Sequence, residues 1–317
     1  MNGLQERLKK KWEELSKQQK IIPSGQSSSS PPRAQANAPP PIPPRPEAAP
    51  RQPPGLTQPY WAADFASSAD VSTQWEYKLG NNNGWGNNEL QHYTASPDNS
   101  FFNSDNKLVV RAISAPTRPE NDTKYTSARL VSRQTLGRNK GCLTTHLSLP
   151  CAPGIWPAFW LLPKEPYKWP EDGEIDIAET WNGDCENHSC LHWGYYTPQD
   201  RNKHLVRGTR VPDMASGRPI RFDFVWNCPS GGPGGRLMWY VDNRPVMKAT
   251  MPSGTRPIDE WCILINVAMG GNVCAGKTPA EGSYDYVVHG ISLNEQPEGG
   301  WDKFEKDQRY CPVGVRF

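Results

Sequence analysis

Short apolar and aromatic runs recur along the chain from Tyr60 onward, and turn-forming residues separate one run from the next. Their β-branched and aromatic content is typical of strands, and few helical stretches interrupt them. This pattern predicts an all-β sandwich or barrel. The clearest runs are residues 107–113, 127–132, 190–196, 220–226, 237–241, 261–267 and 284–288.

One further run is acidic: residues 169–181 read Trp-Pro-Glu-Asp-Gly-Glu-Ile-Asp-Ile-Ala-Glu-Thr-Trp. A helix would place several of these acids on one solvated face. The proline and glycine before the acids, and the β-branched residues among them, favour a strand instead. Because strand side chains alternate, Glu174 and Asp176 share one face, while Ile175 and Ile177 pack behind them.

The third acid of this strand, Glu179, has the wrong parity for the acidic face. One extra residue at positions 177–178, a β-bulge, would turn it back to that face, and without the bulge it points into the core. Three neighbouring carboxylates repel one another, so they need a metal, a basic partner, or chemistry in which one stays protonated. Two glutamates that flank an aspartate in one row match retaining glycoside hydrolysis, which needs carboxyls roughly 5 Å apart.

The motif Glu-Ile-Asp-Ile-Ala-Glu at residues 174–179 resembles that of glycoside hydrolase family 16, in the bulged form typical of laminarinase-like β-glucanases. The resemblance covers about residues 58–293 and implies a concanavalin A-like jelly-roll β-sandwich whose concave sheet forms an open substrate cleft. Further segments similar to the family occur in its order at residues 85–93, 125–130, 154–160, 192–194 and 265–271.

By this resemblance Glu174 is the nucleophile and Glu179 the general acid/base, with Asp176 between them. Glu174 must be ionised to attack the sugar, whereas Glu179 must keep a proton for the leaving oxygen. The implied activity is retaining, endo-acting hydrolysis of β-1,3 or mixed β-1,3/1,4 glucan, with no cofactor required. A transglycosylase and a non-catalytic carbohydrate-binding protein are the alternatives on the same sandwich.

The resemblance also implies substrate-binding residues around the acids. Trp160 and Trp181 are expected to stack on sugar rings in the cleft, and His192 to bond the central aspartate or sugar. Asn88 and Arg129 match positions that contact sugar hydroxyls, with buried structural pairing as the alternative reading. Two more tryptophans crowd the acidic region, at positions 156 and 169, and the first of these is equally compatible with the core.

Some segments depart from the family pattern. Residues 144–146 read Thr-Thr-His where relatives usually carry an acidic-alanine-basic strand. Some relatives hold a structural calcium ion through an aspartate near the C-terminus, and Asp285 is the candidate here. Residues 294–317 lie outside the resemblance.

The N-terminal part of the chain has a different composition. Residues 1–22 predict a charged amphipathic helical segment, and residues 23–57 a disordered, proline-rich linker that precedes a catalytic domain at residues 58–317. Within the linker, the spacing from Pro40 to Arg45 matches the ligands of SH3-type domains, so such a partner is a further hypothesis.

Charge and composition restrict the partners. The net charge of +2 arises because residues 1–57 hold nine basic and four acidic side chains, which leaves the remainder mildly acidic. A neutral β-glucan polysaccharide suits such a surface better than a nucleic acid does. No apolar stretch has the length of a membrane span, so we expect no stable membrane insertion, and we expect a monomer.

All eight cysteines follow residue 140, and their even number fits an oxidised, extracellular fold. Cys185 with Cys190, and Cys262 with Cys274, are candidate disulfides, with buried free thiols as the alternative. The chemistry and the cysteine count favour an extracellular or cell-wall location, although the chain shows no classical export signal at its N-terminus.

Overall fold

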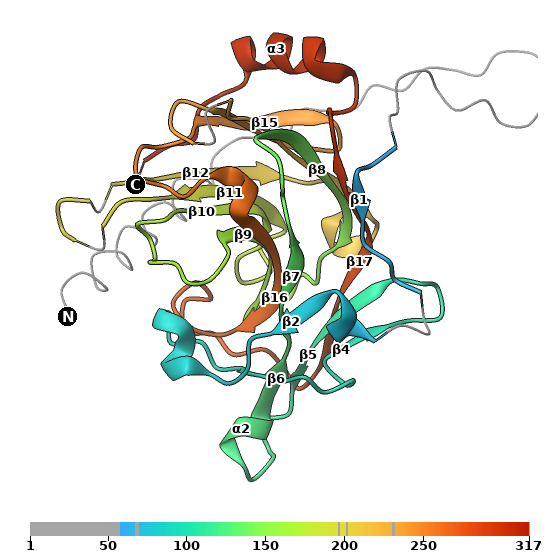
Figure 1. Ribbon diagram of the computed structural model, residues 1–317. Coiled ribbons are helices and arrows are strands. Elements are labelled where there is room, and N and C mark those ends of the chain that lie inside the picture. The colour runs from blue at the N-terminus through green and yellow to red at the C-terminus, as the bar shows by residue number, and fades with distance from the viewer. Residues whose placement is uncertain (1–57, 67–69, 196, 201, 230–231, 317) are drawn as a thin grey trace, which may run out of the picture. The chain divides into compact units, whose positions relative to one another are not determined.

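The computed structural model describes residues 58–66, 70–195, 197–200, 202–229 and 232–316, and its framework is two mainly antiparallel β-sheets (Figure 1). The seven-stranded sheet has the order β12 (His204–Arg210), β11 (Glu186–His192), β10 (Glu174–Glu179), β9 (Ile155–Pro163), β16 (Trp261–Met269), β7 (Arg129–Thr135) and β2 (Trp75–Tyr77). The ten-stranded sheet has the order β15 (Arg244–Thr250), β14 (Arg236–Val241), β13 (Ile220–Asn227), β8 (Lys140–Ser148), β17 (Gly282–Asn294), β5 (Leu108–Ser114), β6 (Tyr125–Ser127) and β3 (His92–Tyr93), with β1 (Trp61–Ala62) paired to β17 and β4 (Ser100–Phe102) to β5.

The hydrophobic core lies between the two sheets. It draws on alternate positions of strands from both, including Phe159 of β9, Ile263 of β16 and Phe224 of β13. Trp239 of β14 crosses this core, and its indole N–H donates a hydrogen bond to the backbone carbonyl of Asp176 on β10 at 2.8 Å. The predicted all-β sandwich is therefore confirmed.

Each of the predicted apolar runs overlaps a strand, although the boundaries differ. The run at residues 190–196 is the clearest difference, because β11 ends at His192. Gly194 has a φ of +82° and turns the chain at that point. A left-handed glycine is a common way to leave a strand, since it has no Cβ to clash.

The C-terminal residues add a helix that the sequence did not predict. Helix α3 (Gly300–Tyr310) packs on the outer face of the ten-stranded sheet (Figure 1). Its buried Phe304 lies in a small cluster with Val225 of β13 and Met238 and Tyr240 of β14. Amphipathic helices bury such a face when a sheet offers apolar side chains on its outer side.

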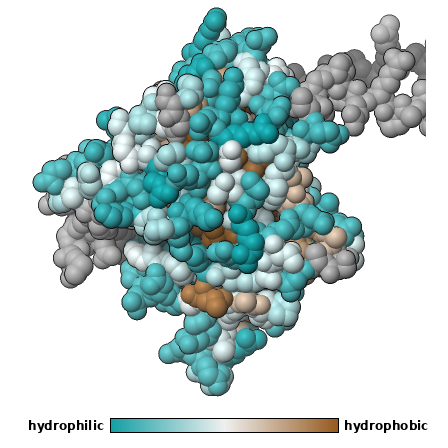
Figure 2. All heavy atoms as spheres, in the orientation of Figure 1, coloured by the Kyte–Doolittle hydropathy of each residue, from teal (hydrophilic) through white to brown (hydrophobic). Residues whose placement is uncertain are grey.

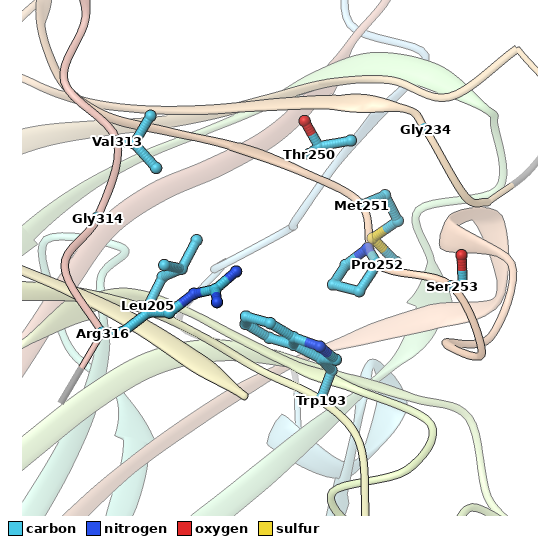
Figure 3. Close-up of a pocket in the computed structure, with 10 residues that line it drawn as sticks. All are labelled: Trp193, Leu205, Gly234, Thr250, Met251, Pro252, Ser253, Val313, Gly314 and Arg316. Atoms are coloured by element: carbon cyan, nitrogen blue, oxygen red, sulfur yellow. The ribbon is translucent and has the colours of Figure 1, made fainter. Parts of the chain in front are cut away.

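The last described residues join the edges of both sheets. Val315 pairs with Val206 of β12, at one edge of the seven-stranded sheet, and Val313 pairs with Lys248 of β15, at one edge of the ten-stranded sheet. A cavity of about 490 Å³ lies beneath this segment, between Trp193, Met251 and Arg316 (Figure 3). The segment therefore covers two strand edges that would otherwise be open.

All eight cysteines are free thiols in the structure, so both candidate disulfides are wrong. Four residues of β11 separate Cys185 from Cys190, and Cys274 lies beyond the far end of β16, beside the backbone of Gly270, whereas Cys262 is at the strand's beginning. Extended chain separates each pair by more than about 10 Å, and a disulfide needs Cα atoms within about 7 Å.

The charged helix expected at residues 1–22, the linker at residues 23–57 and the SH3-type ligand at residues 40–45 lie outside the described residues. The face of the described part seen in Figure 2 is mostly hydrophilic, with hydrophobic residues in small separate patches. Among the helices of the described part, none is long and apolar enough to cross a membrane.

We predict that Phe304→Ala lowers the free energy of unfolding by about 3 kcal/mol, because it leaves a cavity under α3. The midpoint of thermal unfolding should fall by roughly 6 °C or more. Tyr310→Ala is the matched control on the same helix, because Tyr310 is 80% exposed, and it should leave the midpoint almost unchanged. Equal effects of the two substitutions would contradict the packing of α3 on the sheet.

Candidate active site

The acidic strand β10 contains the predicted bulge. Its pairing with β9 places Asp176 opposite Trp160 and Ala178 opposite Phe159, so that Ile177 is one residue in excess. Both Ile177 and Ala178 consequently lie in the core. The register change returns Glu179 to the outer face of the sheet, with Glu174 and Asp176. This confirms the prediction that a bulge at residues 177–178 brings the three acids to one face.

A buried amide satisfies the backbone of the bulge. Asn187 of β11 is fully buried, and its side chain accepts a hydrogen bond from the backbone N–H of Glu179 at 3.2 Å. The same side chain donates to the backbone carbonyl of Ile177 at 3.3 Å. The backbone ladder between β10 and β11 ends at the pair Asp176 and Cys190. The two side-chain bonds therefore continue the connection between these strands beyond the end of the ladder.

Tryptophan side chains donate hydrogen bonds to both glutamates. The indole N–H of Trp169 donates to Glu174 Oε2 at 2.9 Å. Glu179 accepts two such bonds, from Trp156 at 2.9 Å on Oε1 and from Trp181 at 3.1 Å on Oε2. Sequence reasoning missed these roles of Trp156 and Trp169, although both residues stand beside the acidic motif.

His192 is the last residue of β11 and lies directly opposite Glu174 in the ladder between β10 and β11. Its Nε2 is 3.3 Å from Asp176 Oδ2 and 3.9 Å from Glu174 Oε1. The predicted contact between His192 and the central aspartate is therefore present. Asp176 is only 2% exposed, so its carboxylate depends on such partners.

The environment raises the pKa of both glutamates. Burial raises the pKa of Glu174 from its ordinary value of 4.5 to about 7, and the charge of Asp176 adds to the shift. Burial and the same aspartate raise the pKa of Glu179 well above its ordinary range, although the two indoles oppose the change. For His192, burial lowers the pKa, but the hydrogen bond and charge of Asp176 outweigh burial and raise it overall.

Arg129, the first residue of β7, has its guanidinium over two aromatic rings. Its guanidinium carbon is 4.5 Å from the ring centre of Trp85 and 4.6 Å from that of Trp160. Trp160 is only 9% exposed, and its indole N–H donates to Asn266, so little of this ring is free for a sugar. The Nε of Arg129 and the indole nitrogen of Trp85 are buried without a hydrogen-bond partner among the described residues.

Two other predicted contact residues have partners within the protein. The ring of Trp181, a half-buried residue, stacks on His188 with centroids 3.7 Å apart and an interplanar angle of 2°. Asn88 is exposed, has a φ of +56°, and donates to Asn272 Oδ1 at 3.0 Å. No contact of Asn88 with the acidic row is recorded among the described residues.

The calcium candidate does not fit a cation site. Asp285 pairs across the ladder with Arg111, whose guanidinium donates to both carboxylate oxygens, at 2.6 and 2.9 Å. The arginine neutralises this carboxylate, and Asp285 belongs to no group of three or more possible metal ligands in the described part of the chain. A different triad, Asp176, Cys190 and His192, has ligand atoms within 4.8 Å, but it belongs to the acidic row and its buried Cys190 has a raised pKa.

One sheet of the β-sandwich thus carries a bulged row of three acids, and the two glutamates of this row accept hydrogen bonds from indoles. A family model described as "XgeA-like, catalytic GH16 domain" matches residues 75–212. The beta-glucanase of Rhodothermus marinus is 30% identical over 255 residues, which cover 72% of this chain and 85% of the relative. This chain belongs to glycoside hydrolase family 16.

Two further comparisons extend this result. A LamA variant from Zobellia galactanivorans, solved in complex with laminaritriose and laminaritetraose, has a TM-score of 0.63 and 26% identity, and the match covers 76% of this chain and 100% of that one. Glucan endo-1,3-beta-glucosidase A1 of Niallia circulans is 29% identical over 249 residues, or 69% of this chain. The chain spans about a third (35%) of the length of this relative and of the clotting factor G alpha subunit of Tachypleus tridentatus.

We predict that Asn187→Ala exposes the bulge to unfolding, because two buried backbone groups lose their partners. The free energy of unfolding should fall by about 2 kcal/mol or more, and the amide of Glu179 should exchange its hydrogen faster under native conditions. Asn99→Ala removes an equally buried amide far from the bulge and should leave that amide protected. Unchanged exchange at Glu179 in Asn187→Ala would contradict this role.

Proposed function

We propose that this domain is a retaining, endo-acting hydrolase of β-1,3 or mixed β-1,3/1,4 glucan. The observation that carries the proposal is the bulge, which brings two glutamates with raised pKa values to one face on either side of a buried aspartate. The relatives named beta-glucanase and glucan endo-1,3-beta-glucosidase, and the neighbour that holds laminarin oligosaccharides, support this choice of substrate.

In the first step, the ionised Glu174 attacks the anomeric carbon while Glu179 donates its proton to the leaving glycosidic oxygen. In the second, Glu179 takes a proton from water, which attacks the glycosyl ester and releases a product with retained configuration. Asp176 holds a negative charge between the two glutamates and favours the protonated form of Glu179. The indole of Trp169 orients the nucleophile.

The unpaired donors of Arg129 and Trp85 are proposed to bind sugar hydroxyls, because buried donors without partners are costly until a ligand supplies an acceptor. If a sugar hydroxyl replaces water in the second step, the same site acts as a transglycosylase. The expectations of a monomer without a cofactor, and of an SH3-type partner, stay hypotheses.

We predict that Glu174→Gln reduces laminarin hydrolysis by at least about 10⁴-fold, since the covalent step has no nucleophile, while binding of laminarin persists. Glu179→Gln should lose about 10²–10⁴-fold, because only general acid/base help is removed. Asp98→Asn, a change at an exposed acid, is the control. Turnover at the wild-type rate by Glu174→Gln would refute the assignment, and no turnover of any β-glucan by the wild type would favour a binding protein.

We predict that kcat/KM on laminarin rises with pH up to about 7, because Glu174 must lose its proton before it attacks. It should fall again only at higher pH, where Glu179 loses the proton it donates. In Asp176→Asn the rising limb should move to lower pH, since the charge that raises the pKa of Glu174 is gone. A rising limb at the same pH in both proteins would contradict the electrostatic coupling.

A further inference from the structure

Two cysteine thiols lie together beside the candidate active site. Cys151 precedes β9, and Cys185 lies in the turn between β10 and β11. The two thiols interact with each other, and the Cys151 thiol also contacts the backbone N–H of Cys185. Both side chains are partly exposed, so a small molecule in solution can reach them.

The backbone segments that carry these thiols are in direct contact. The side chain of Asn182 accepts a hydrogen bond from the backbone N–H of Gly154 at 2.8 Å. A Cβ atom at Gly183 would come within 2.5 Å of the carbonyl carbon of Ala152, so only glycine permits this approach. These contacts between the two segments therefore hold positions 151 and 185 near each other, independently of the thiols.

We propose that Cys151 and Cys185 form a reversible disulfide when the protein meets a low-molecular-weight disulfide such as glutathione disulfide. Burial raises the pKa of Cys151, so we place the first reaction at Cys185. The Cys185 thiol loses its proton and attacks one sulfur of glutathione disulfide, which releases one glutathione thiol and leaves a mixed disulfide. Cys151 then loses its proton, attacks the Cys185 sulfur, and releases the second glutathione.

The bond would fasten the turn that carries Trp181 to the segment before Trp156. These are the two indoles that donate to Glu179, one from each side. Oxidation therefore links the two segments whose indoles position Glu179, the proposed proton donor. In the reduced protein, only hydrogen bonds and packing hold these segments together. The loop closed by the bond contains the whole of β9 and β10.

The test treats the reduced 317-residue chain with glutathione disulfide, alkylates the remaining thiols under denaturing conditions, and maps peptides by mass. The wild type should lose two alkylated thiols and give one cross-linked peptide pair that contains Cys151 and Cys185. Its midpoint of thermal unfolding should rise by roughly 5 °C or more on oxidation. Cys151→Ser should retain one glutathione on Cys185, Cys185→Ser should leave Cys151 unmodified, and neither should gain thermal stability.

Cys262→Ser is the matched control, because Cys262 is buried on β16 and no other thiol is recorded near it in the described part of the chain. It should behave as the wild type. If a serine variant does not fold, the corresponding alanine variant replaces it. The proposal is overturned if the treated wild type keeps all eight thiols, if Cys185 stays glutathionylated in the wild type, or if the cross-link joins other cysteines.

Discussion

Two hydrogen bonds support the acidic row: the Asn187 side chain accepts one from the backbone N–H of Glu179 and donates one to the backbone carbonyl of Ile177. In a regular strand, Glu179 would face the core, and the extra residue Ile177 is what turns it outward. A bulge leaves backbone groups unpaired inside the sandwich, and each such group costs about 1–3 kcal/mol. The neutral amide of Asn187 serves both positions, because its oxygen accepts from one backbone group and its NH2 donates to the other. The charged chemistry on the outer face thus depends on an uncharged group beneath it.

Indole donors suit a row of acids whose protonation must change during a reaction. An indole N–H gives one hydrogen bond and neither gains nor loses a proton in the working range of pH, so it fixes a carboxyl without fixing its charge. Lysine or arginine in the same place would hold the carboxylate ionised. The indole hydrogen bonds lower the pKa values of Glu174 and Glu179, but burial and the charge of Asp176 outweigh them and raise both.

Local properties of the acidic strand were predictable from the sequence, and distant pairings were not. Residue spacing alone required a bulge to bring Glu179 to the acidic face, because parity is a property of one strand. The supporting Asn187 lies on the next strand, and nothing in the spacing of residues marks its role. Asp285 is paired with Arg111 by the register of two strands that are distant in sequence. Cysteine pairing likewise depends on the separation of strands in space, which their number and order do not reveal.

The two outer faces of the sandwich differ in what they carry: a helix packs on the ten-stranded sheet, and the row of acids lies on the seven-stranded sheet. Helix α3 covers part of the ten-stranded sheet, and the C-terminal segment covers an edge of each sheet. If the outer face of the seven-stranded sheet binds a polysaccharide chain, as proposed, it cannot be covered in this way, and it also carries buried carboxylates that oppose folding. Stability must therefore come from the core and from the covered face. Substitutions in α3 should consequently act on the stability of the domain, whereas substitutions of the acids on the outer face of β10 act on its chemistry.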